Sequence, residues 1–365
     1  MKIGVLKEQA PGERRVALVP EVVAKLTAAE VMVETGAGAV ANFPDSAYDA
    51  AGATIASRAE ICRDANVIVC VGPPDGLVLS RGQLLVGLLR PHERAAQMRA
   101  WAAAGATVVS LDLLPRMLSR AQAMDALSSQ ANVVGYKGVL VAANAYGGYF
   151  PMLVTAAGTV RPARVLVLGA GVAGLQALGT ARRLGAIVTG YDVRSEARAE
   201  VQSVGARFLD LAGDPEAVGT GGYARELTDD EREAQQLALR AAIGDADVVI
   251  TTAGVPSHQP PVLVTEEAIK EMHPGSVVVD TAAGPLGGNV ALSKPNGTVS
   301  VDGVTIIGAG NLAAEMPAAA STAYARNIQA TLGSLCPGGE PHIDLTDEIQ
   351  DAIVVVHGGE VRDER

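Results

Sequence analysis

The 365-residue sequence is poor in aromatic residues and cysteine. Aromatic residues make up only 3% of the chain, so the 48% apolar fraction must build the interior from Val, Ala, Leu and Ile. That composition is typical of buried parallel sheets covered by alanine-rich helices. The three cysteines, Cys62, Cys70 and Cys336, are odd in number and far apart, which indicates neither a disulfide framework nor a zinc site. We therefore expect no metal and a reducing, cytoplasmic environment.

Positive charge and long apolar runs are also scarce. The 29 basic and 40 acidic residues give a net charge of −11, which argues against nucleic acid as a partner. No stretch reaches the roughly 18 uninterrupted apolar residues of a spanning helix, because the nearest one, residues 133–150, contains Lys137 and Asn144. The N-terminus has no apolar core of the kind found in signal peptides. We expect a soluble chain without a secretion signal.

Short apolar runs alternate with helical patterns along the chain, which predicts parallel sheets with right-handed crossovers. The length suits two domains. We predict an α/β fold of two Rossmann-like, doubly wound parallel-sheet domains joined by two long helices, with a cleft between them. The first domain is expected to hold residues 1–125 together with the C-terminal segment 313–365, and the second residues 126–312.

A glycine cluster stands between an apolar run and a helical pattern in the second domain. Gly169, Gly171 and Gly174 have the G-x-G-x-x-G spacing, in which the first allows a tight turn, the second a close approach to a pyrophosphate, and the third close helix packing. Val172 and Ala173 open the helix whose N–H groups would face the anion. This context predicts a dinucleotide site; the alternative is a tight turn that binds nothing.

An acid follows at the end of the next apolar run. Asp192 stands 18 residues after Gly174, where a carboxylate accepts hydrogen bonds from ribose hydroxyls and repels a 2′-phosphate. We therefore expect NAD(H) rather than NADP(H), with Val193 and Arg194 beside the site. Arg194 is the one feature that would weaken this preference.

A polar cluster in residues 114–130 lies between an apolar run and a long helical pattern. Its candidate site residues are Arg116, Arg120, Gln122, Asp125 and Ser128. On the residues alone, a capping role for Asp125 or Ser128 explains the cluster equally well.

Few other residues are placed for acid–base chemistry. His92 follows an apolar run and is the histidine best placed for it, with a solvated helix start as the alternative. Arg14 and Arg15 also follow an apolar run, where they would meet an anion or form an ion pair.

Longer segments resemble the family that joins alanine dehydrogenases to the NAD(H)-binding component of proton-translocating nicotinamide nucleotide transhydrogenases. The start "PGERRVALVPEVVAKL" resembles the family as a whole. The transhydrogenase branch is resembled by "SRAQAMDALSSQANVVGYKGV", "TAAGTVRPARVLVLGAGVAGLQA", "YDVRSEA", "GGYARELTDDE" and "PGSVVVDTAAGPLGGN". The resemblance covers essentially the whole chain.

The resemblance implies roles for individual residues. The glycines and Asp192 would form the pyrophosphate and ribose site, and Tyr223 would belong to a mobile loop that closes on the nucleotide. The loop over the nicotinamide would contribute Gln122, Asp125 and Ser128.

One departure concerns the arginine of that loop. The family pattern Pro-Arg-Ile-Ser-Arg-Ala-Gln is here Pro-Arg-Met-Leu-Ser-Arg-Ala-Gln. The extra residue leaves the nicotinamide-contacting arginine open between Arg116 and Arg120, of which we favour Arg116.

Chemistry separates the two branches. An alanine dehydrogenase must move protons and places a Lys, a His and an Asp around its substrate, whereas this chain has Gly72, Arg90 and Pro285 near those positions. Hydride transfer between two nicotinamides needs orientation and exclusion of water instead. The resemblance thus implies a subunit that reduces NADP⁺ with NADH. The alternatives are an amino-acid dehydrogenase and a non-catalytic NAD-binding regulator.

The resemblance also implies partners. The NADP(H)-binding and transmembrane subunits would be separate chains, and proton flow through the transmembrane part would drive the reaction. We expect a homodimer that is peripheral on the cytoplasmic face of the membrane.

Overall fold

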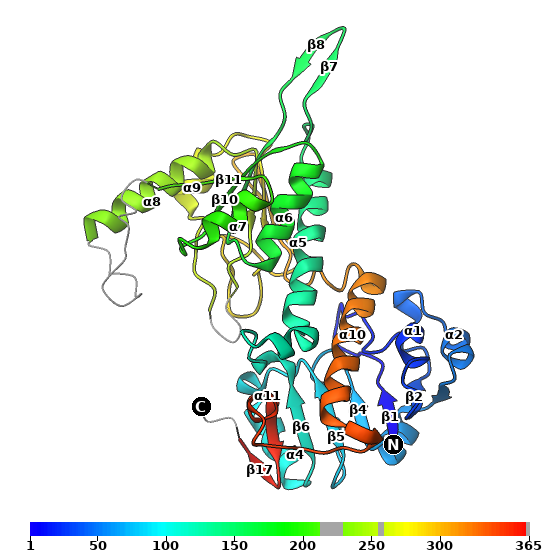
Figure 1. Ribbon diagram of the computed structural model, residues 1–365. Coiled ribbons are helices and arrows are strands. Elements are labelled where there is room, and N and C mark those ends of the chain that lie inside the picture. The colour runs from blue at the N-terminus through cyan, green and yellow to red at the C-terminus, as the bar shows by residue number, and fades with distance from the viewer. Residues whose placement is uncertain (212–228, 255–258, 363–365) are drawn as a thin grey trace. The chain divides into compact units, whose positions relative to one another are not determined.

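The computed structural model describes residues 1–211, 229–254 and 259–362, which divide into two compact units (Figure 1). The first unit holds Met1–Val133 and Ala313–Arg365, and the second holds Val134–Leu312. The predicted α/β class with parallel sheets is confirmed. The change from the first unit to the second falls inside α5 (Ala126–Ala145), later than the boundary at residue 125 expected from the sequence.

The first unit contains an eight-stranded sheet in the order β17-β16-β6-β5-β4-β1-β2-β3. Strands β1 to β6 are parallel, and they have the doubly wound order 3-2-1-4-5-6. β16 from the C-terminal segment adds antiparallel to β6, and β17 adds to β16. The strands are β1 (Lys2–Val5), β2 (Glu30–Glu34), β3 (Thr54–Ala56), β4 (Val67–Val69), β5 (Leu84–Gly87), β6 (Thr107–Ser110), β16 (Val354–His357) and β17 (Glu360–Val361).

Helices cover both faces of this sheet. Successive residues of a strand point to opposite faces, so Val67 and Val69 pack with Tyr324 of α10, whereas Ile68 packs with Trp101 of α4. The α1 helix is a single turn and not the longer helix that residues 20–30 predict, because the chain turns at 27–29 into β2. The helices are α1 (Pro20–Val23), α2 (Asp45–Ala50), α3 (Arg58–Asp64), α4 (Ala95–Ala103), α10 (Pro317–Leu335) and α11 (Glu348–Ile353), with short 3₁₀ turns that include η2 (Pro91–Glu93) and η4 (Ser119–Met124).

The second unit contains a seven-stranded sheet in the order β11-β10-β9-β12-β13-β15-β14. All neighbours are parallel except the edge pair β14 and β15. The sequence predicts five of these strands and misses β11, which is two residues long, and β14, whose side chains are not buried. The strands are β9 (Arg164–Leu168), β10 (Ile187–Tyr191), β11 (Arg207–Phe208), β12 (Val248–Thr251), β13 (Val277–Asp280), β14 (Thr298–Val301) and β15 (Val304–Gly308).

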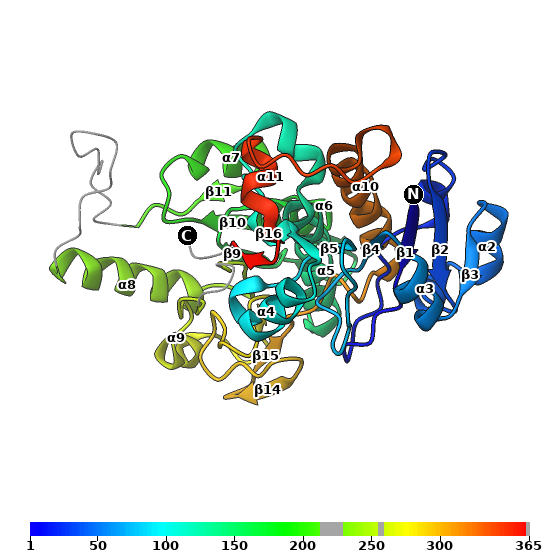
Figure 2. The same ribbon diagram turned by 90° about the horizontal axis from the view of Figure 1, so that it is seen from below.

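Two helical layers cover this second sheet. Ile250 packs with Leu178 of α6 on one face, and Val249 packs with Ile269 of α9 on the other. α8 and α9 lie side by side (Figure 1, Figure 2), and a hairpin of β7 (Leu153–Thr155) and β8 (Gly158–Val160) projects from the unit. The helices, besides α5, are α6 (Val172–Arg183), α7 (Ala197–Ser203), α8 (Asp229–Gly244) and α9 (Glu266–Glu271). No helix in the described part of the chain is long and apolar enough to cross a membrane.

A glycine lets α5 approach the start of α6. A Cβ added to Gly135 would lie 2.0 Å from the carbonyl oxygen of Ala173, which is backbone and cannot swing away. One helical turn later, a Cβ on Gly138 would meet only side-chain atoms at 3.6 Å or more, which is ordinary contact. The two glycines of the same helix therefore differ in what they allow.

We expect Gly135→Ala to lower the free energy of unfolding of the second unit by about 1–3 kcal/mol, because the added methyl forces two helices apart. Gly138→Ala is the matched control and should be neutral or stabilising by up to about 1 kcal/mol, since alanine loses less backbone entropy in a helix. Equilibrium unfolding in urea, followed by circular dichroism, measures both. Equal changes in the two variants would contradict the proposed close packing.

Candidate functional site

The second sheet changes direction between β9 and β12. β10 lies on one side of β9 and β12 on the other. In doubly wound sheets, ligands bind outside the carboxyl ends of the strands at this point. The segments that leave those two ends are residues 169–171 after β9 and residues 252–254 after β12.

The three glycines of the turn after β9 serve different purposes. Gly169 has φ of +100°, which favours glycine. A Cβ on Gly174 would lie 1.8 Å from the carbonyl oxygen of Gly169, so only glycine lets the helix pack on the turn. A Cβ on Gly171 would meet no atom within 4 Å. The space over Gly171 is therefore open, as the close approach of a ligand requires.

The N-terminus of α6 faces the same turn. Gly171 is its N-cap residue, no side chain caps it, and its first turn carries no acid. The first N–H groups of a helix have no partner within the helix, and the helix dipole favours an anion there. Val172 and Ala173 thus begin a 12-residue helix that is suited to hold a pyrophosphate.

Asp192 joins the end of β10 to the glycine turn. Its carboxylate accepts a hydrogen bond from the N–H of Ala170 at 2.7 Å and from the N–H of Arg194 at 2.9 Å. The Arg194 guanidinium also donates to it, with Nε at 3.0 Å and Nη2 at 3.2 Å. Burial alone would raise the pKa of Asp192, but the hydrogen bonds from Arg194 outweigh it and lower the pKa. The acid is therefore ionised at neutral pH, next to an exposed Val193.

The segment after β12 contacts the glycine turn, which the sequence analysis did not predict. The Thr252 N–H donates to the carbonyl oxygen of Leu168 at 2.8 Å, and its Oγ1 donates to that of Gly169 at 2.9 Å. A sequence signal exists: "VVITTAG" is an apolar strand that ends in threonines and a small, glycine-containing turn. Its carboxyl end meets the same edge of a parallel sheet as the glycine motif.

The polar cluster predicted from residues 114–130 forms in the first unit. Nε of Arg116 lies 3.1 Å from the carboxylate of Asp125, and its Nη2 donates to Oγ of Ser128 at 2.8 Å. Asp125 also accepts from the backbone N–H and the hydroxyl of Ser128 at 2.8 and 2.6 Å. Asp125 therefore caps α5 and binds Arg116 at once, so the two interpretations of the sequence are both realised.

The other residues of this cluster point elsewhere. Arg120 forms its ion pairs with Asp347 and Glu348 at the start of α11 rather than with Asp125. Gln122 is exposed on η4, and its carbonyl oxygen accepts from the N–H of Asp125. Tyr223 lies outside the described residues.

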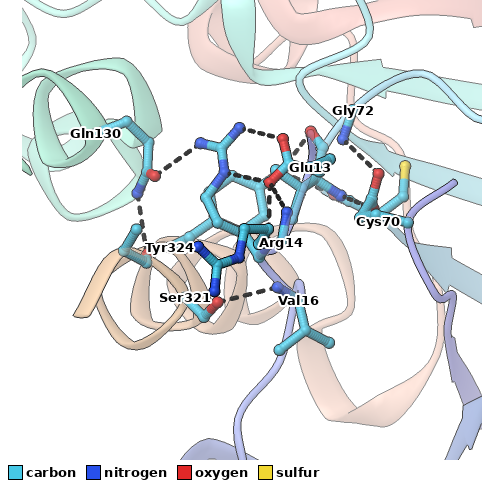
Figure 3. Close-up of polar contacts among 12 residues, drawn as sticks. Glu13, Arg14, Val16, Cys70, Gly72, Gln130, Ser321 and Tyr324 are labelled. Atoms are coloured by element: carbon cyan, nitrogen blue, oxygen red, sulfur yellow. Dashed lines mark hydrogen bonds and ion pairs between the residues drawn. The ribbon is translucent and has the colours of Figure 1, made fainter. Parts of the chain in front are cut away.

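The first sheet has the same change of direction, between β1 and β4. There a side chain of this chain occupies the strand ends: the Glu8 carboxylate accepts from the N–H of Val71 at 2.6 Å and of Gly72 at 3.3 Å. Burial raises the pKa of Glu8 to about 7, although the bond from Val71 opposes it. The hydroxyl of Tyr324 in α10 donates to the carbonyl oxygen of Cys70 beside it (Figure 3).

Arg15 is buried beside Glu8 and meets an acid of its own segment. Its Nη2 lies 2.7 Å from the Glu13 carboxylate, and its Nη1 donates to Gln130 of α5 at 2.8 Å (Figure 3). The side chains of Arg15 and Glu13 are only 12% and 9% exposed. Burial would raise the pKa of Glu13, but the bonds and charge of Arg15 lower it. The ion pair that the sequence offered as an alternative for Arg15 is thus present, and it is buried.

Comparison with known proteins agrees with this geometry. Residues 4–134 match the family described as "Alanine dehydrogenase/PNT, N-terminal domain", and residues 138–364 match "Alanine dehydrogenase/PNT, C-terminal domain". The chain belongs to the alanine dehydrogenase/PNT family. The membership predicted from the sequence motifs is confirmed.

Relatives within the alanine dehydrogenase/PNT family bear a more specific name. The NAD(P) transhydrogenase subunit alpha of Cereibacter sphaeroides is 42% identical over 372 aligned residues, which cover 99% of this chain and 71% of that protein. An NAD(P) transhydrogenase subunit alpha protein of Rhodospirillum rubrum is 42% identical over 94% of this chain and 91% of its own. A transhydrogenase structure from Sinorhizobium meliloti is 38% identical and covers 99% of this chain and 100% of its own, with a TM-score of 0.88.

The buried Glu8 predicts an unusual pH dependence of stability. An unfolded glutamate releases its proton near pH 4.5, whereas the folded Glu8 keeps it until about pH 7. The folded protein therefore loses stability as pH rises from 4.5 to 7. Relative to Glu8→Gln, which does not titrate, the wild-type free energy of unfolding should fall by about 3 kcal/mol between pH 4.5 and 8.

The measurement is urea unfolding of both proteins across this pH range. Glu21→Gln is the control, because Lys25 holds the pKa of the exposed Glu21 below its usual value, so any effect has the opposite sign. A wild-type-minus-variant difference for Glu8 that stays constant with pH would contradict the burial argument.

Proposed function

We propose that this chain is the NAD(H)-binding subunit of an NAD(P) transhydrogenase, and that it passes a hydride from NADH directly to NADP⁺ on a partner subunit. The observation that carries the proposal is the open glycine turn at the start of α6, with ionised Asp192 beside it. Relatives that match over nearly the whole chain, and are named as transhydrogenase alpha subunits, support it. NADH is then a substrate and supplies the hydride.

The residues of the second unit would bind and orient the dinucleotide. Gly169, Gly171 and Gly174, with the N–H groups of Val172 and Ala173, would hold the pyrophosphate. Asp192 would accept from the adenosine ribose hydroxyls, with Val193 and Tyr223 as further contacts. A carboxylate there repels a 2′-phosphate, which favours NADH.

Arg194 bears on how strong that preference is. In the structure both oxygens of Asp192 accept bonds from this arginine. The ribose hydroxyls would have to share the carboxylate with Arg194 or displace it. The guanidinium is 54% exposed, so moving it aside breaks no buried contact of its own.

The residues of the first unit would act at the nicotinamide. We assign this end of the dinucleotide to Arg116, Gln122, Asp125 and Ser128. Direct transfer between two nicotinamide carbons moves no proton at those carbons, so this cluster has to orient the ring and exclude water. The hydrogen bonds that join Arg116, Asp125 and Ser128 fix three polar groups in one arrangement before the substrate binds.

We further propose that the reaction is coupled to proton translocation. The coupling would require membrane-embedded and NADP(H)-binding partners on separate chains, with this chain peripheral on the cytoplasmic face of the membrane. A homodimer is the proposed state of the chain itself.

The rival activity, amino-acid oxidation, requires groups that exchange protons. At the three positions where the sequence comparison places them, this chain has no such group. Gly72 offers only its N–H, which donates to Glu8. Arg90 is an exposed arginine that lies 3.9 Å from Glu93, and the third position is Pro285.

The deciding experiment mixes the purified chain with an NADP(H)-binding transhydrogenase subunit, NADH and thio-NADP⁺, and follows reduction of the analogue by absorbance. We expect turnover only when both proteins are present. NADH binding without turnover would replace the proposal with a non-catalytic regulator. NADH production from NAD⁺ and L-alanine by the chain alone would replace it with an amino-acid dehydrogenase.

The two candidate arginines should behave differently in that assay. We expect Arg116→Ala to lower the rate of hydride transfer by about tenfold to a hundredfold, because a misplaced ring reacts slowly, with a smaller change in the Kd for NADH. Arg120→Ala is the matched control and should keep a rate close to wild type, since Arg120 pairs with α11. The reverse result would assign the nicotinamide contact to Arg120.

A further inference from the structure

Asp280 is a fully buried acid at the carboxyl end of β13. Four groups donate to its carboxylate: the hydroxyl of Thr251 at 3.2 Å and the backbone N–H groups of Ala282, Asn289 and Val290 at 3.1, 3.2 and 3.3 Å. A carboxylate that accepts only from donors ties the end of β12 to the segment that follows β13. Asp280 thus holds together two chain segments at the edge where a doubly wound sheet binds its ligand.

Asn289 extends this network toward the glycine turn. Its Nδ2 donates to the carbonyl oxygens of Ala253 and Pro261 at 2.9 and 2.8 Å, and its Oδ1 accepts from the N–H of Ala253 at 3.2 Å. The neighbour of Ala253 is Thr252, whose hydroxyl donates to the carbonyl oxygen of Gly169. Hydrogen bonds and one peptide unit therefore lead from Asp280 to the first glycine of the turn.

The surroundings leave this network no freedom to shift. A Cβ added to Gly288 would lie 2.1 Å from Oδ2 of Asp280, so glycine is required where the segment passes the carboxylate. On the other side, a Cβ on Gly169 would lie 2.8 Å from Oγ1 of Thr252. Both ends of the network are packed to the limit, so a displaced Asp280 must displace residues 252–254.

We propose that Asp280, acting through Asn289, is a positioning residue for the dinucleotide site. It sets the place of residues 252–254 against the glycine turn, and it contacts no substrate itself. This inference rests on the proposed function, because it assumes that the dinucleotide binds between the ends of β9 and β12. It adds to that function a residue that the glycine motif does not contain.

A second buried acid of the same sheet provides a matched comparison. Asp247 is 4% exposed and precedes β12, at the opposite end of the strand from Thr251. It accepts from the Arg161 guanidinium at 2.9 and 3.1 Å and from the N–H of Arg164 at 2.8 Å. The two acids share burial and a structural role, but only Asp280 lies at the ligand edge.

The test compares Asp280→Asn with Asp247→Asn in the full chain. The readouts are the Kd for NADH, from the fluorescence of the bound nucleotide, and the thermal midpoint of the nucleotide-free protein. Both variants should lose thermal stability, because each leaves buried donors without an acceptor. Only Asp280→Asn should also raise the Kd for NADH, by about tenfold, while Asp247→Asn should change it by less than about twofold.

A milder pair of variants keeps the proposal testable if Asp280→Asn does not fold. Thr252→Val removes the bond to Gly169 at nearly constant volume and should raise the Kd by about three- to tenfold. Thr180→Val is its control, because the Thr180 hydroxyl donates to the carbonyl oxygen of Gln176 within α6, away from the turn. It should leave the Kd unchanged.

The outcomes separate this inference from the proposed function. A wild-type chain that does not bind NADH would overturn both. Wild-type binding with equal Kd values in Asp280→Asn and Asp247→Asn, or a wild-type Kd in Thr252→Val, would overturn the positioning role alone. A Kd change confined to Asp280→Asn and Thr252→Val would establish it.

Discussion

Backbone N–H groups that leave the carboxyl ends of parallel strands need acceptors, and carboxylates supply many of them here. Glu8 accepts from the segment after β4, Asp192 from the glycine turn after β9, and Asp280 from the segment after β13. An unmade bond at a buried N–H costs as much as a kcal/mol or more. In the described part of the second unit, the first turn of α6 is where no side chain takes this role, and that is where an anionic ligand fits.

The two sheets show how one arrangement can give different results. Both are doubly wound and both change direction at their first strand. In the first unit Glu8 lies across the strand ends, and the nearby Arg15 is neutralised by Glu13. In the second unit the corresponding place is lined by glycine, with open space over Gly171. The difference explains why we place the dinucleotide on the second sheet, although the topology alone would allow either.

The chemistry proposed for the chain follows from what its polar clusters can do. The Arg116 cluster joins an arginine, a carboxylate that already caps a helix, and a hydroxyl. Such a set is suited to hold a ring in place, whereas amino-acid oxidation requires groups that take up and release protons. Asp280 and Asn289 fit the same pattern, since hydride transfer depends on placement more than on reactive side chains.

Residue patterns along the chain determined the fold class, the glycine turn and the family, because strand alternation and the G-x-G-x-x-G spacing are local signals. Only the tertiary structure decided between the partners of similar residues. The sequence left Arg116 and Arg120 equivalent, and folding paired one with Asp125 and the other with Asp347, 227 residues away. The burial of Glu8 and the path from Asp280 to Gly169 are likewise hydrogen bonds between distant segments, which no local pattern records.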